Sequence, residues 1–321
     1  MNILYSTDEN YSEICLSSIR SLLEKNKGVK ELKIYIIDDN ITEKTKTKIA
    51  TEIKHYKRNY FFISCMEICK GVKKNNKFPI SAYARLFVQD NIKENKVIYL
   101  DCDTIVETEL TELWDIELED NWIAGVQDLL PSYLIKAIGM DPNERYINSG
   151  VLVINLKKWR QINFKAKVIQ YMKEYNNNVI HHDQGIINGL CKDKILYLEP
   201  KFNLMPEMLM MNEGQIKKLY KMSNFYSEQQ LEASRVNPAI IHYICKFYNR
   251  PWFKECTHPY KNKFLKYYKG ELKSNPLSIK IKFRKFVFEK LPFSIYCMIE
   301  KILDFRRKKY VKKIVGDKIW N

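Results

Sequence analysis

The stretch Val97-Ile98-Tyr99-Leu100-Asp101-Cys102-Asp103 is four apolar residues followed directly by an acidic turn. A short apolar run that ends so abruptly predicts a buried β-strand. In open α/β sheets, ligands bind outside the carboxyl ends of the strands. Asp101 and Asp103 therefore lie where a ligand is expected. Two carboxylates separated by one residue suit a hard divalent cation such as Mg²⁺ or Mn²⁺.

Short apolar segments alternate with helix-length amphipathic segments on both sides of this stretch. That alternation is typical of βαβ units and predicts an α/β fold with a mainly parallel sheet. We expect strands at residues 2–6, 33–37, 60–65, 97–100, 122–126, 146–154 and 239–243. We expect helices at residues 11–25, 43–55, 81–91, 157–174, 183–191, 277–288 and 292–315. Residues 201–238 are rich in Met and Asn and weakly periodic, which predicts loops that form a pocket wall.

The net charge of +16 is unevenly distributed along the chain. Residues 261–321 hold 18 Lys/Arg and 5 Asp/Glu, which leaves residues 1–260 with a net charge of only +3. Residues 101–130 hold ten Asp/Glu and no Lys or Arg. This acidic segment, in a Lys-rich protein, favours a cation site around Asp101 and Asp103.

The first residues and the cysteines indicate a cytoplasmic protein. No basic leader followed by an apolar stretch is present, and the eight cysteines form neither a CxxC pair nor a regular framework. With ten glycines and no Gly-x-Gly-x-x-Gly motif, the sequence does not favour a conventional dinucleotide-binding fold. We expect His55 and His258 at the surface, and His181-His182 near the acceptor side rather than in a zinc site.

Four further motifs flank the Asp101-Cys102-Asp103 motif in a fixed order. They are Tyr5-Ser6-Thr7-Asp8-Glu9-Asn10-Tyr11, Tyr146-Ile147-Asn148-Ser149-Gly150, His181-His182-Asp183-Gln184-Gly185, and Ile241-His242-Tyr243 with Arg250-Pro251-Trp252. Together the five resemble glycosyltransferase family 8, the retaining sugar transferases that include bacterial lipopolysaccharide and lipooligosaccharide galactosyl- and glucosyltransferases.

The resemblance covers about residues 1–255. It implies a GT-A type nucleotide-diphospho-sugar transferase fold, with a Rossmann-like mixed sheet, over residues 1–260. Residues 261–321 then form a basic amphipathic helical extension. Apolar residues on one side of this extension and Lys/Arg on the other favour a peripheral anchor on the anionic inner face of the cell membrane.

The resemblance implies a role for each motif residue that contacts the donor. Asp8 and Asn10 would contact the uridine of a UDP-sugar, with Ser6 nearby through its backbone. Arg85 would face the donor's diphosphate or sugar, and Asp128 would lie near the donor and acceptor sugars.

The metal and the transferred sugar would be held by the remaining motifs. The resemblance implies that Asp101, Asp103 and His242 bind the metal; an imidazole beside two carboxylates suits Mn²⁺ better than Mg²⁺. Asn148 and Asp183 would hydrogen-bond the transferred glucose or galactose, and Gln184 would lie beside the anomeric carbon.

The resemblance also implies an electrostatic mechanism. An amide at Gln184, where a double displacement would use a carboxylate, favours attack by the acceptor hydroxyl on the face that UDP leaves. Asp183 remains an alternative nucleophile. The acceptor would be a cell-surface glycan, lipid-linked or free, such as a lipopolysaccharide or capsular chain.

One motif departs from the family pattern. The family usually has His-x-x-Gly-x-x-Lys-Pro-Trp, whereas the segment from His242 to Trp252 is two residues longer and has no glycine. Arg250 would take the cationic role beside the diphosphate, with Lys246 as a substitute.

Two other functions use the same features. Leu100-Asp101-Cys102-Asp103-Thr104 also resembles the nucleophile loop of haloacid-dehalogenase-type phosphatases, although that motif normally follows the first strand. The basic charge could alternatively serve a nucleic-acid-binding protein, but no recognisable nucleic-acid-binding module is present.

Overall fold

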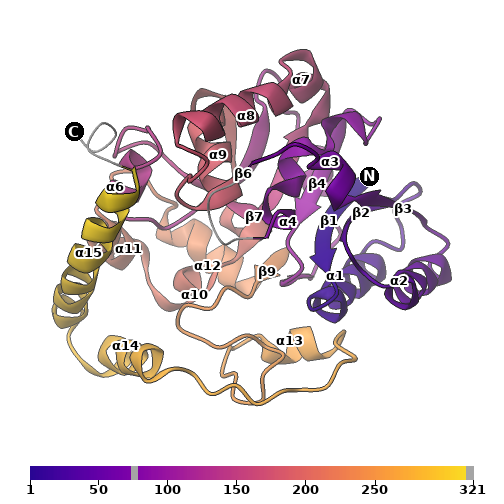
Figure 1. The fold of residues 1–321 in the computed structure, drawn as a ribbon. Coiled ribbons are helices and arrows are strands. Elements are labelled where there is room, and N and C mark those ends of the chain that lie inside the picture. The colour runs from indigo at the N-terminus through magenta and orange to yellow at the C-terminus, as the bar shows by residue number, and fades with distance from the viewer. Residues whose placement is uncertain (74–78, 316–321) are drawn as a thin grey trace.

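A computed structural model describes residues 1–73 and 79–315 of the chain. A seven-stranded sheet runs through its centre in the order β3-β2-β1-β4-β7-β6-β8. The strands are β1 (Asn2–Asp8), β2 (Lys33–Asp39), β3 (Asn59–Ser64), β4 (Lys96–Leu100), β6 (Ile123–Gln127), β7 (Ile147–Asn155) and β8 (Ile195–Leu198). The expected α/β fold with a mixed, mainly parallel sheet is confirmed (Figure 1).

One strand of the seven is reversed. β7 is antiparallel to both of its neighbours, β4 and β6, while the other neighbouring pairs are parallel. The carboxyl ends of β1, β4 and β6 therefore share one edge of the sheet with the amino end of β7. That edge carries most of the polar motifs.

Alternating apolar residues give the sheet two buried faces. Along β4, Ile98 and Leu100 belong to one core, and Val97 and Tyr99 to the other. One face is covered by α1 (Ser12–Lys25) together with segments of the second half of the chain. The other is covered by α7 (Leu156–Gln161), α8 (Phe164–Glu174) and α9 (His182–Cys191). A strand with both faces buried needs an apolar residue at every position. This explains why the residues from Val97 to Leu100 are all apolar.

A small second sheet closes the fold beside the acidic turn. β5 (Thr104–Val106) pairs antiparallel with β9 (Ile240–His242), and Thr104 lies opposite His242. This pairing brings the expected strand near residue 240 next to the Asp101-Cys102-Asp103 turn.

The other helices that precede residue 266 are short, except α2 with its 13 residues. They are α2 (Glu43–His55), α3 (Cys65–Ile68), α4 (Ser81–Ala84), α5 (Thr111–Trp114), α6 (Ser132–Lys136), α10 (Pro206–Met210), α11 (Glu213–Tyr220), α12 (Glu228–Val236) and α13 (Lys261–Leu265). Three 3-10 turns complete them, η1 (Arg85–Asp90), η2 (Lys192–Lys194) and η3 (Pro200–Asn203). The expected helix at 81–91 is thus a short α-helix that continues as a 3-10 helix.

Two sequence predictions about secondary structure were wrong. The expected helix at 157–174 is two helices, because Asn163 adopts a left-handed conformation (φ 50°) and its side chain caps α8. Residues 201–238 are largely helical rather than loops. Asn212 with Gln215, and Ser227 with Gln230, form reciprocal capping boxes that start α11 and α12. The edge strand β8 was not predicted.

The sequence predicted that His55 and His258 both lie at the surface, and the structure agrees for only one of them. His55 is exposed, as predicted. His258 is only 4% exposed and packs against Tyr243 and Tyr248, so the prediction of a surface position was wrong. This burial depends on how the chain folds back to place both tyrosines against the ring, which the residues next to His258 do not indicate.

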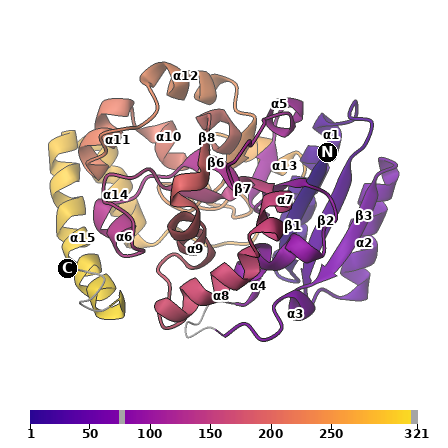
Figure 2. The ribbon, with the colours of Figure 1, turned by 90° about the horizontal axis from the view of Figure 1, so that it is seen from above.

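Two helices end the described chain, α14 (Ile279–Lys290) and α15 (Phe293–Val315). Both views show α15 along one side of the molecule, next to α6 and α11 and far from α2 and β3 (Figures 1 and 2). Within the described ranges, no helix is both long and apolar enough to cross a membrane. Of the expected extension, residues 316–321 lie outside the described residues.

Candidate active site

The acidic turn lies at the sheet edge where β4 ends and the reversed β7 begins. The backbone N–H of Asp101 donates to the carbonyl oxygen of Gly150 over 2.8 Å, and that of Asp128 donates to the carbonyl oxygen of Tyr146, also over 2.8 Å. Because β7 runs backwards between β4 and β6, its first residues lie between the last residues of its neighbours. Three motifs distant in sequence are thereby brought together.

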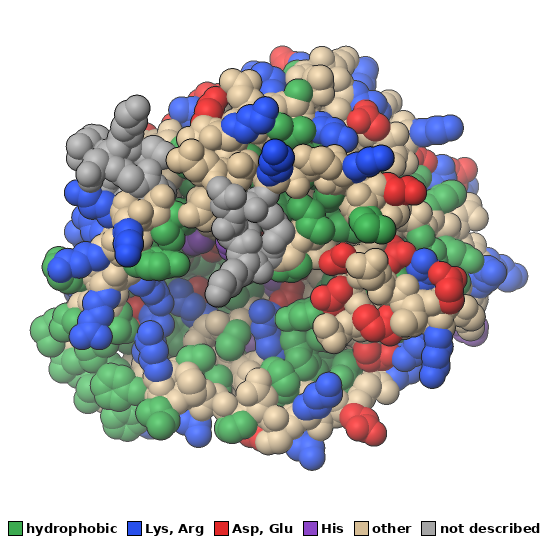
Figure 3. Space-filling view, in the orientation of Figure 1, with side chains coloured by type: hydrophobic (Ala, Val, Ile, Leu, Met, Phe, Trp, Pro, Cys, Tyr) green, Lys and Arg blue, Asp and Glu red, His purple; other side chains and the backbone are tan. Residues whose placement is uncertain are grey.

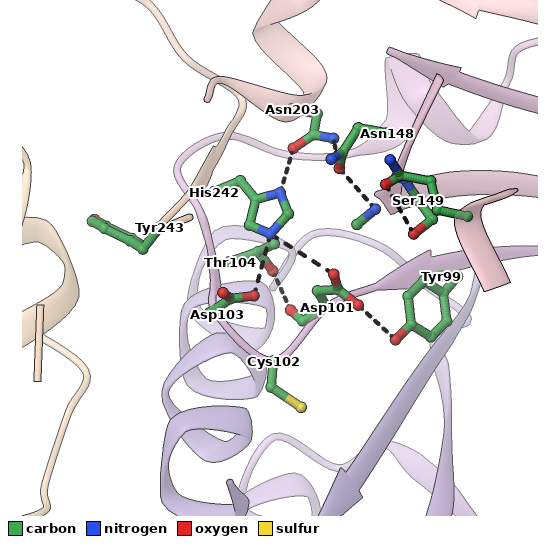
Figure 4. Close-up of polar contacts among 12 residues, drawn as sticks. Tyr99, Asp101, Cys102, Asp103, Thr104, Asn148, Ser149, Asn203, His242 and Tyr243 are labelled. Carbon is green, nitrogen blue, oxygen red and sulfur yellow. Dashed lines mark hydrogen bonds and ion pairs between the residues drawn. The ribbon is translucent and has the colours of Figure 1, made fainter. Parts of the chain in front are cut away.

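Asp101, Asp103 and His242 form a cluster whose donor atoms all lie within 4.8 Å of one another. The Nε2 atom of His242 is 3.7 Å from Oδ2 of Asp101 and 3.2 Å from Oδ1 of Asp103 (Figure 4). Among the residues that the structure describes, this is the one group of three or more His, Cys, Asp or Glu with metal-ligand geometry.

Asn203, at the end of η3, orients the His242 ring. The Nδ1 of His242 lies 2.9 Å from Oδ1 of Asn203, whose Nδ2 donates to Oδ1 of Asn148 over 2.9 Å. With Nδ1 donating to the amide oxygen, Nε2 carries the lone pair that faces the two aspartates. A hydrogen bond of this kind fixes the tautomer of a metal-binding histidine.

The ionisation states in the cluster fit a divalent cation. Burial lowers the pKa of His242, so the imidazole is neutral, as a metal ligand must be. Burial of Asp101 favours the neutral acid. The charge of Arg85, with hydrogen bonds from Tyr99 and Arg85, overcomes this and holds the pKa of Asp101 below its ordinary value. Two carboxylates and a neutral imidazole suit Mn²⁺ or Mg²⁺.

Gly150 leaves the space that the His242 ring occupies. A Cβ atom at this position would overlap Cε1 of His242 and lie 2.7 Å from its Nδ1. The glycine of the Asn148-Ser149-Gly150 motif is therefore required by the close approach of this ring to β7.

Two arginines border the aspartates. Arg85 reaches Oδ1 of Asp101 with Nη2 over 3.0 Å and Oδ2 of Asp183 with Nε over 3.3 Å, and it stacks 3.8 Å from the centre of the Tyr99 ring. Arg250 forms an ion pair with Asp103 and donates to the carbonyl oxygen of Tyr243 over 2.7 Å. Both guanidinium groups therefore lie beside the candidate metal ligands.

A second polar network surrounds Gln184. Its Nε2 donates to Oδ2 of Asp128 over 2.9 Å, and Nδ2 of Asn148 donates to the same oxygen over 3.1 Å. The backbone N–H of Ser149 donates to Oε1 of Gln184 over 2.9 Å. These bonds fix which way the Gln184 amide faces.

Asp183 lies at the start of α9, after two strained residues. His181 and His182 have φ values of 60° and 53°, in the left-handed region that non-glycine residues rarely adopt. Asp183 is buried, and this burial raises its pKa above the ordinary value. A Cβ at Gly185 would overlap the carbonyl oxygen of Ile180, so the turn requires that glycine.

A cavity of about 280 Å³ opens onto the acidic turn. Its lining combines the first motif, Arg85 and the aspartates: Ser6, Thr7, Asp8, Tyr11, Pro79, Ser81, Ala82, Arg85, Tyr99, Asp101, Cys102 and Asp103. Asn10 is exposed in the turn after β1 and is not part of this lining. Lys246 lines a different cavity, and its Nζ pairs with Oε1 of Glu207 over 3.2 Å.

Asn203 and Tyr99 are site residues that sequence reasoning missed. Tyr99 donates to Oδ1 of Asp101 over 2.7 Å. Its place two residues before Asp101 on a strand puts both side chains on one face, which could have revealed it. Asn203 gives no such signal, because it lies in the segment predicted as loops.

A comparison with protein families agrees with this arrangement. Residues 2–256 match the model of glycosyl transferase family 8. The chain belongs to glycosyltransferase family 8. As such it is a hexosyltransferase with a GT-A fold, and this membership supports that function over the phosphatase and the nucleic-acid-binding alternatives.

Relatives of this family 8 transferase extend over most of its length. General stress protein A of Bacillus subtilis is 27% identical over 83% of this chain and 92% of its own. A lipopolysaccharide 1,3-galactosyltransferase of Salmonella typhimurium is 25% identical over 82% of this chain and 76% of its own. The solved structure of galactosyltransferase LgtC with donor and acceptor sugar analogues superposes with a TM-score of 0.68, at 26% identity over 88% of this chain and 99% of that one.

Proposed function

We propose that this family 8 enzyme transfers glucose or galactose from a UDP-sugar with retention of anomeric configuration, and that it depends on Mn²⁺ or, less effectively, Mg²⁺. The observation that carries the proposal is the cluster of Asp101, Asp103 and His242, whose two aspartates line a cavity together with Ser6, Asp8 and Arg85. A cation held there would neutralise charge on a departing diphosphate.

The first motif and the arginines would bind the donor. Ser6 and Asp8 line the cavity and would contact the uridine, as would the exposed Asn10 in the turn that follows β1. Arg85 and Arg250 border the aspartates and would contact the diphosphate. Lys246 is the weaker candidate for this role, since it lines another cavity and is paired with Glu207.

The second network would hold the hexose. Asn148 and Asp183 would hydrogen-bond its hydroxyl groups, and Gln184 would lie beside the anomeric carbon with Asp128 behind it. An amide cannot form a stable glycosyl ester, so the acceptor hydroxyl would attack from the face that UDP leaves. The buried Asp183, paired with Arg85, is better placed to bind the sugar than to act as the nucleophile.

We further propose that the enzyme works in the cytoplasm, peripherally at the inner face of the membrane, and extends a cell-surface glycan. The relative from Salmonella typhimurium is a lipopolysaccharide transferase. Residues 261–321 would be a basic extension that follows a catalytic domain of residues 1–260. Within the extension, large apolar side chains are exposed: Ile279, Phe283, Phe286, Leu291, Met298, Ile302, Phe305 and Tyr310. Lysines and arginines interleave with them, as at an anionic leaflet.

The test is UDP release from a panel of UDP-sugars with EDTA, Mg²⁺ or Mn²⁺. We expect UDP-glucose or UDP-galactose to be hydrolysed slowly in the absence of an acceptor, with Mn²⁺ giving the fastest release and EDTA abolishing it. Retention of configuration is then read from the transferred product by NMR. If no UDP-sugar is bound or hydrolysed with any of these metals, the proposal is wrong.

A further inference from the structure

Helix α1 buries three serine hydroxyl groups inside the fold. Ser17, Ser18 and Ser21 are all fully buried. Figure 3 shows acidic side chains gathered over α1 and α2, so these hydroxyls lie beneath a charged surface rather than on it. A buried hydroxyl costs free energy unless it is hydrogen-bonded. The partners of these serines therefore indicate what the buried polar groups of α1 hold in place.

Ser18 links two other buried hydroxyl groups. Its Oγ lies 3.0 Å from the hydroxyl oxygen of Tyr5 in β1 and 3.0 Å from Oγ1 of Thr104, the residue that follows Asp103. Oγ1 of Thr104 in turn donates to the carbonyl oxygen of Asp101 over 2.8 Å. Tyr5 and Thr104 are, like Ser18, fully buried. A continuous chain of hydrogen bonds thus runs from β1 through α1 to the acidic turn.

The protons of this chain can be arranged in only one direction. Each hydroxyl has one proton to donate. Thr104 gives its proton to the carbonyl oxygen of Asp101, so its own oxygen accepts from Ser18. Ser18 has then used its proton and accepts from Tyr5. Every hydroxyl is satisfied, and the last bond ends on the backbone of a candidate metal ligand.

The bond from Thr104 fixes one peptide group of the acidic turn. By holding the carbonyl oxygen of Asp101, it fixes the peptide between Asp101 and Cys102. The carbonyl oxygen of Asp103 is held separately, by the backbone N–H of Tyr243 over 2.9 Å. A peptide group is planar, so its orientation sets the direction of the backbone on either side of it. A carbonyl free to turn away would let the two carboxylates diverge from a shared cation.

The next buried serine of the helix holds β5, the strand that follows the turn. The backbone N–H of Val106 donates to Oγ of Ser21 over 2.9 Å. Ser18 and Ser21 are three residues apart, so they lie on one face of the helix. β5 pairs with β9, where Thr104 lies opposite His242. Helix α1 therefore supports both the aspartates and the strand pair that sets His242 beside them.

We infer that Ser18 and Thr104 are positioning residues for the metal. Their hydroxyl groups hold the acidic turn in the conformation that directs both aspartates at one cation. They thereby raise the affinity for Mn²⁺ without contacting the ion. The inference rests on the proposed function, since it requires that a divalent cation binds between Asp101, Asp103 and His242.

The test removes each hydroxyl with the least change of shape. Thr104→Val replaces the hydroxyl with a methyl group, and Thr104→Ser keeps the hydroxyl. Ser18→Ala breaks the chain within α1. Its matched control is Ser17→Ala, because Ser17 is equally buried in the same helix but donates to the carbonyl oxygen of Glu13. The affinity for Mn²⁺ is read from the electron paramagnetic resonance signal of the free ion during titration, and the melting temperature without metal is measured beside it.

We expect Thr104→Val to raise the dissociation constant for Mn²⁺ by about tenfold, as for other residues that orient a metal ligand. Ser18→Ala should raise it by about threefold, since Thr104 keeps its bond to Asp101 and only one hydrogen bond behind it is lost. Thr104→Ser and Ser17→Ala should stay within about twofold of the native protein. These affinities should not follow the melting temperatures, which a merely structural role would lower in all four variants.

Native affinity for Mn²⁺ in either Thr104→Val or Ser18→Ala would overturn the inference. So would equal losses in Thr104→Val and Thr104→Ser, because the hydroxyl would then not be the group that matters. If Thr104→Val does not fold by circular dichroism, the comparison of Ser18→Ala with Ser17→Ala decides in the same way. A native protein that binds no Mn²⁺ would instead overturn the proposed function, and the inference with it.

Discussion

The His242 ring occupies the space where a side chain at Gly150 would stand. A Cβ atom there would overlap Cε1 of the ring, and β7 is fixed on both edges by its neighbours, so the backbone cannot retreat. The imidazole can approach Asp101 and Asp103 only because residue 150 has no side chain. Two motifs that are far apart in sequence thus depend on each other.

Gly150→Ala should displace the imidazole and weaken metal binding. We expect the affinity for Mn²⁺ to fall by about tenfold or more, because one of three protein ligands is moved. Calorimetric titration with Mn²⁺ measures this without reference to activity. Gly214→Ala is the control, since a Cβ at Gly214 meets nothing closer than 3.6 Å. Native Mn²⁺ affinity in Gly150→Ala would show that the ring is not a ligand.

Asn203→Ala should also weaken metal binding, by releasing the hydrogen bond to Nδ1 of His242. Loss of such an outer partner typically lowers metal affinity 10–100-fold. The readout is the electron paramagnetic resonance signal of free Mn²⁺ during titration. Asn224→Ala, at an exposed position, should titrate like the native protein. A purely structural role for Asn203 would lower the melting temperature and leave Mn²⁺ affinity unchanged.

Replacing the exposed apolar groups of α15 should release the protein from membranes. Burial of one large apolar side chain contributes about 2 kcal/mol. The double variant Ile302→Ser, Phe305→Ser should therefore bind phosphatidylglycerol vesicles more weakly by about tenfold or more in a sedimentation assay. Val236→Ser removes an equally exposed side chain elsewhere and should bind like the native protein. Undiminished binding by the double variant would contradict the proposed membrane contact.

The buried His258 should make stability depend on pH in the mildly acidic range. Burial, reinforced by the charge of Lys285, lowers its pKa to about 4, and its Nδ1 accepts a hydrogen bond from the backbone N–H of Tyr260. The unfolded chain binds a proton near pH 6.5 but the folded chain does not, so stability is lost as pH falls from 6.5 towards 4. The contribution between pH 7 and 5 is about 2 kcal/mol.

Urea unfolding at several pH values measures this contribution. His258→Phe should show a shallower loss of unfolding free energy between pH 7 and 5 than the native protein. His55→Phe, at an exposed position, should keep the native slope. Identical slopes for the native protein and His258→Phe would mean that His258 titrates normally.

The sequence by itself determined the class of the fold and the kind of site. A buried strand has to be apolar on both faces, so Val97 to Leu100 could be recognised without a structure. Carboxylates directly after such a strand lie at the edge where ligands bind, so Asp101 and Asp103 could be recognised too. Local hydrogen bonding likewise determines the caps of α11 and α12, and the spacings from Asn212 to Gln215 and from Ser227 to Gln230 carry that signal.

Only the tertiary structure decided which distant residues complete the site. The pairing of β5 with β9 sets His242 beside Asp103, and η3 brings Asn203 behind the ring. The packing of α15 against the rest of the molecule forms one wall of the cavity that Lys246 lines. These contacts join segments that are far apart in the chain, and the sequence of one segment does not indicate that it contacts the other. Periodicity and spacing in the sequence indicate which residues of one helix or strand are buried. Which strands pair and which helices pack together depends on the whole fold.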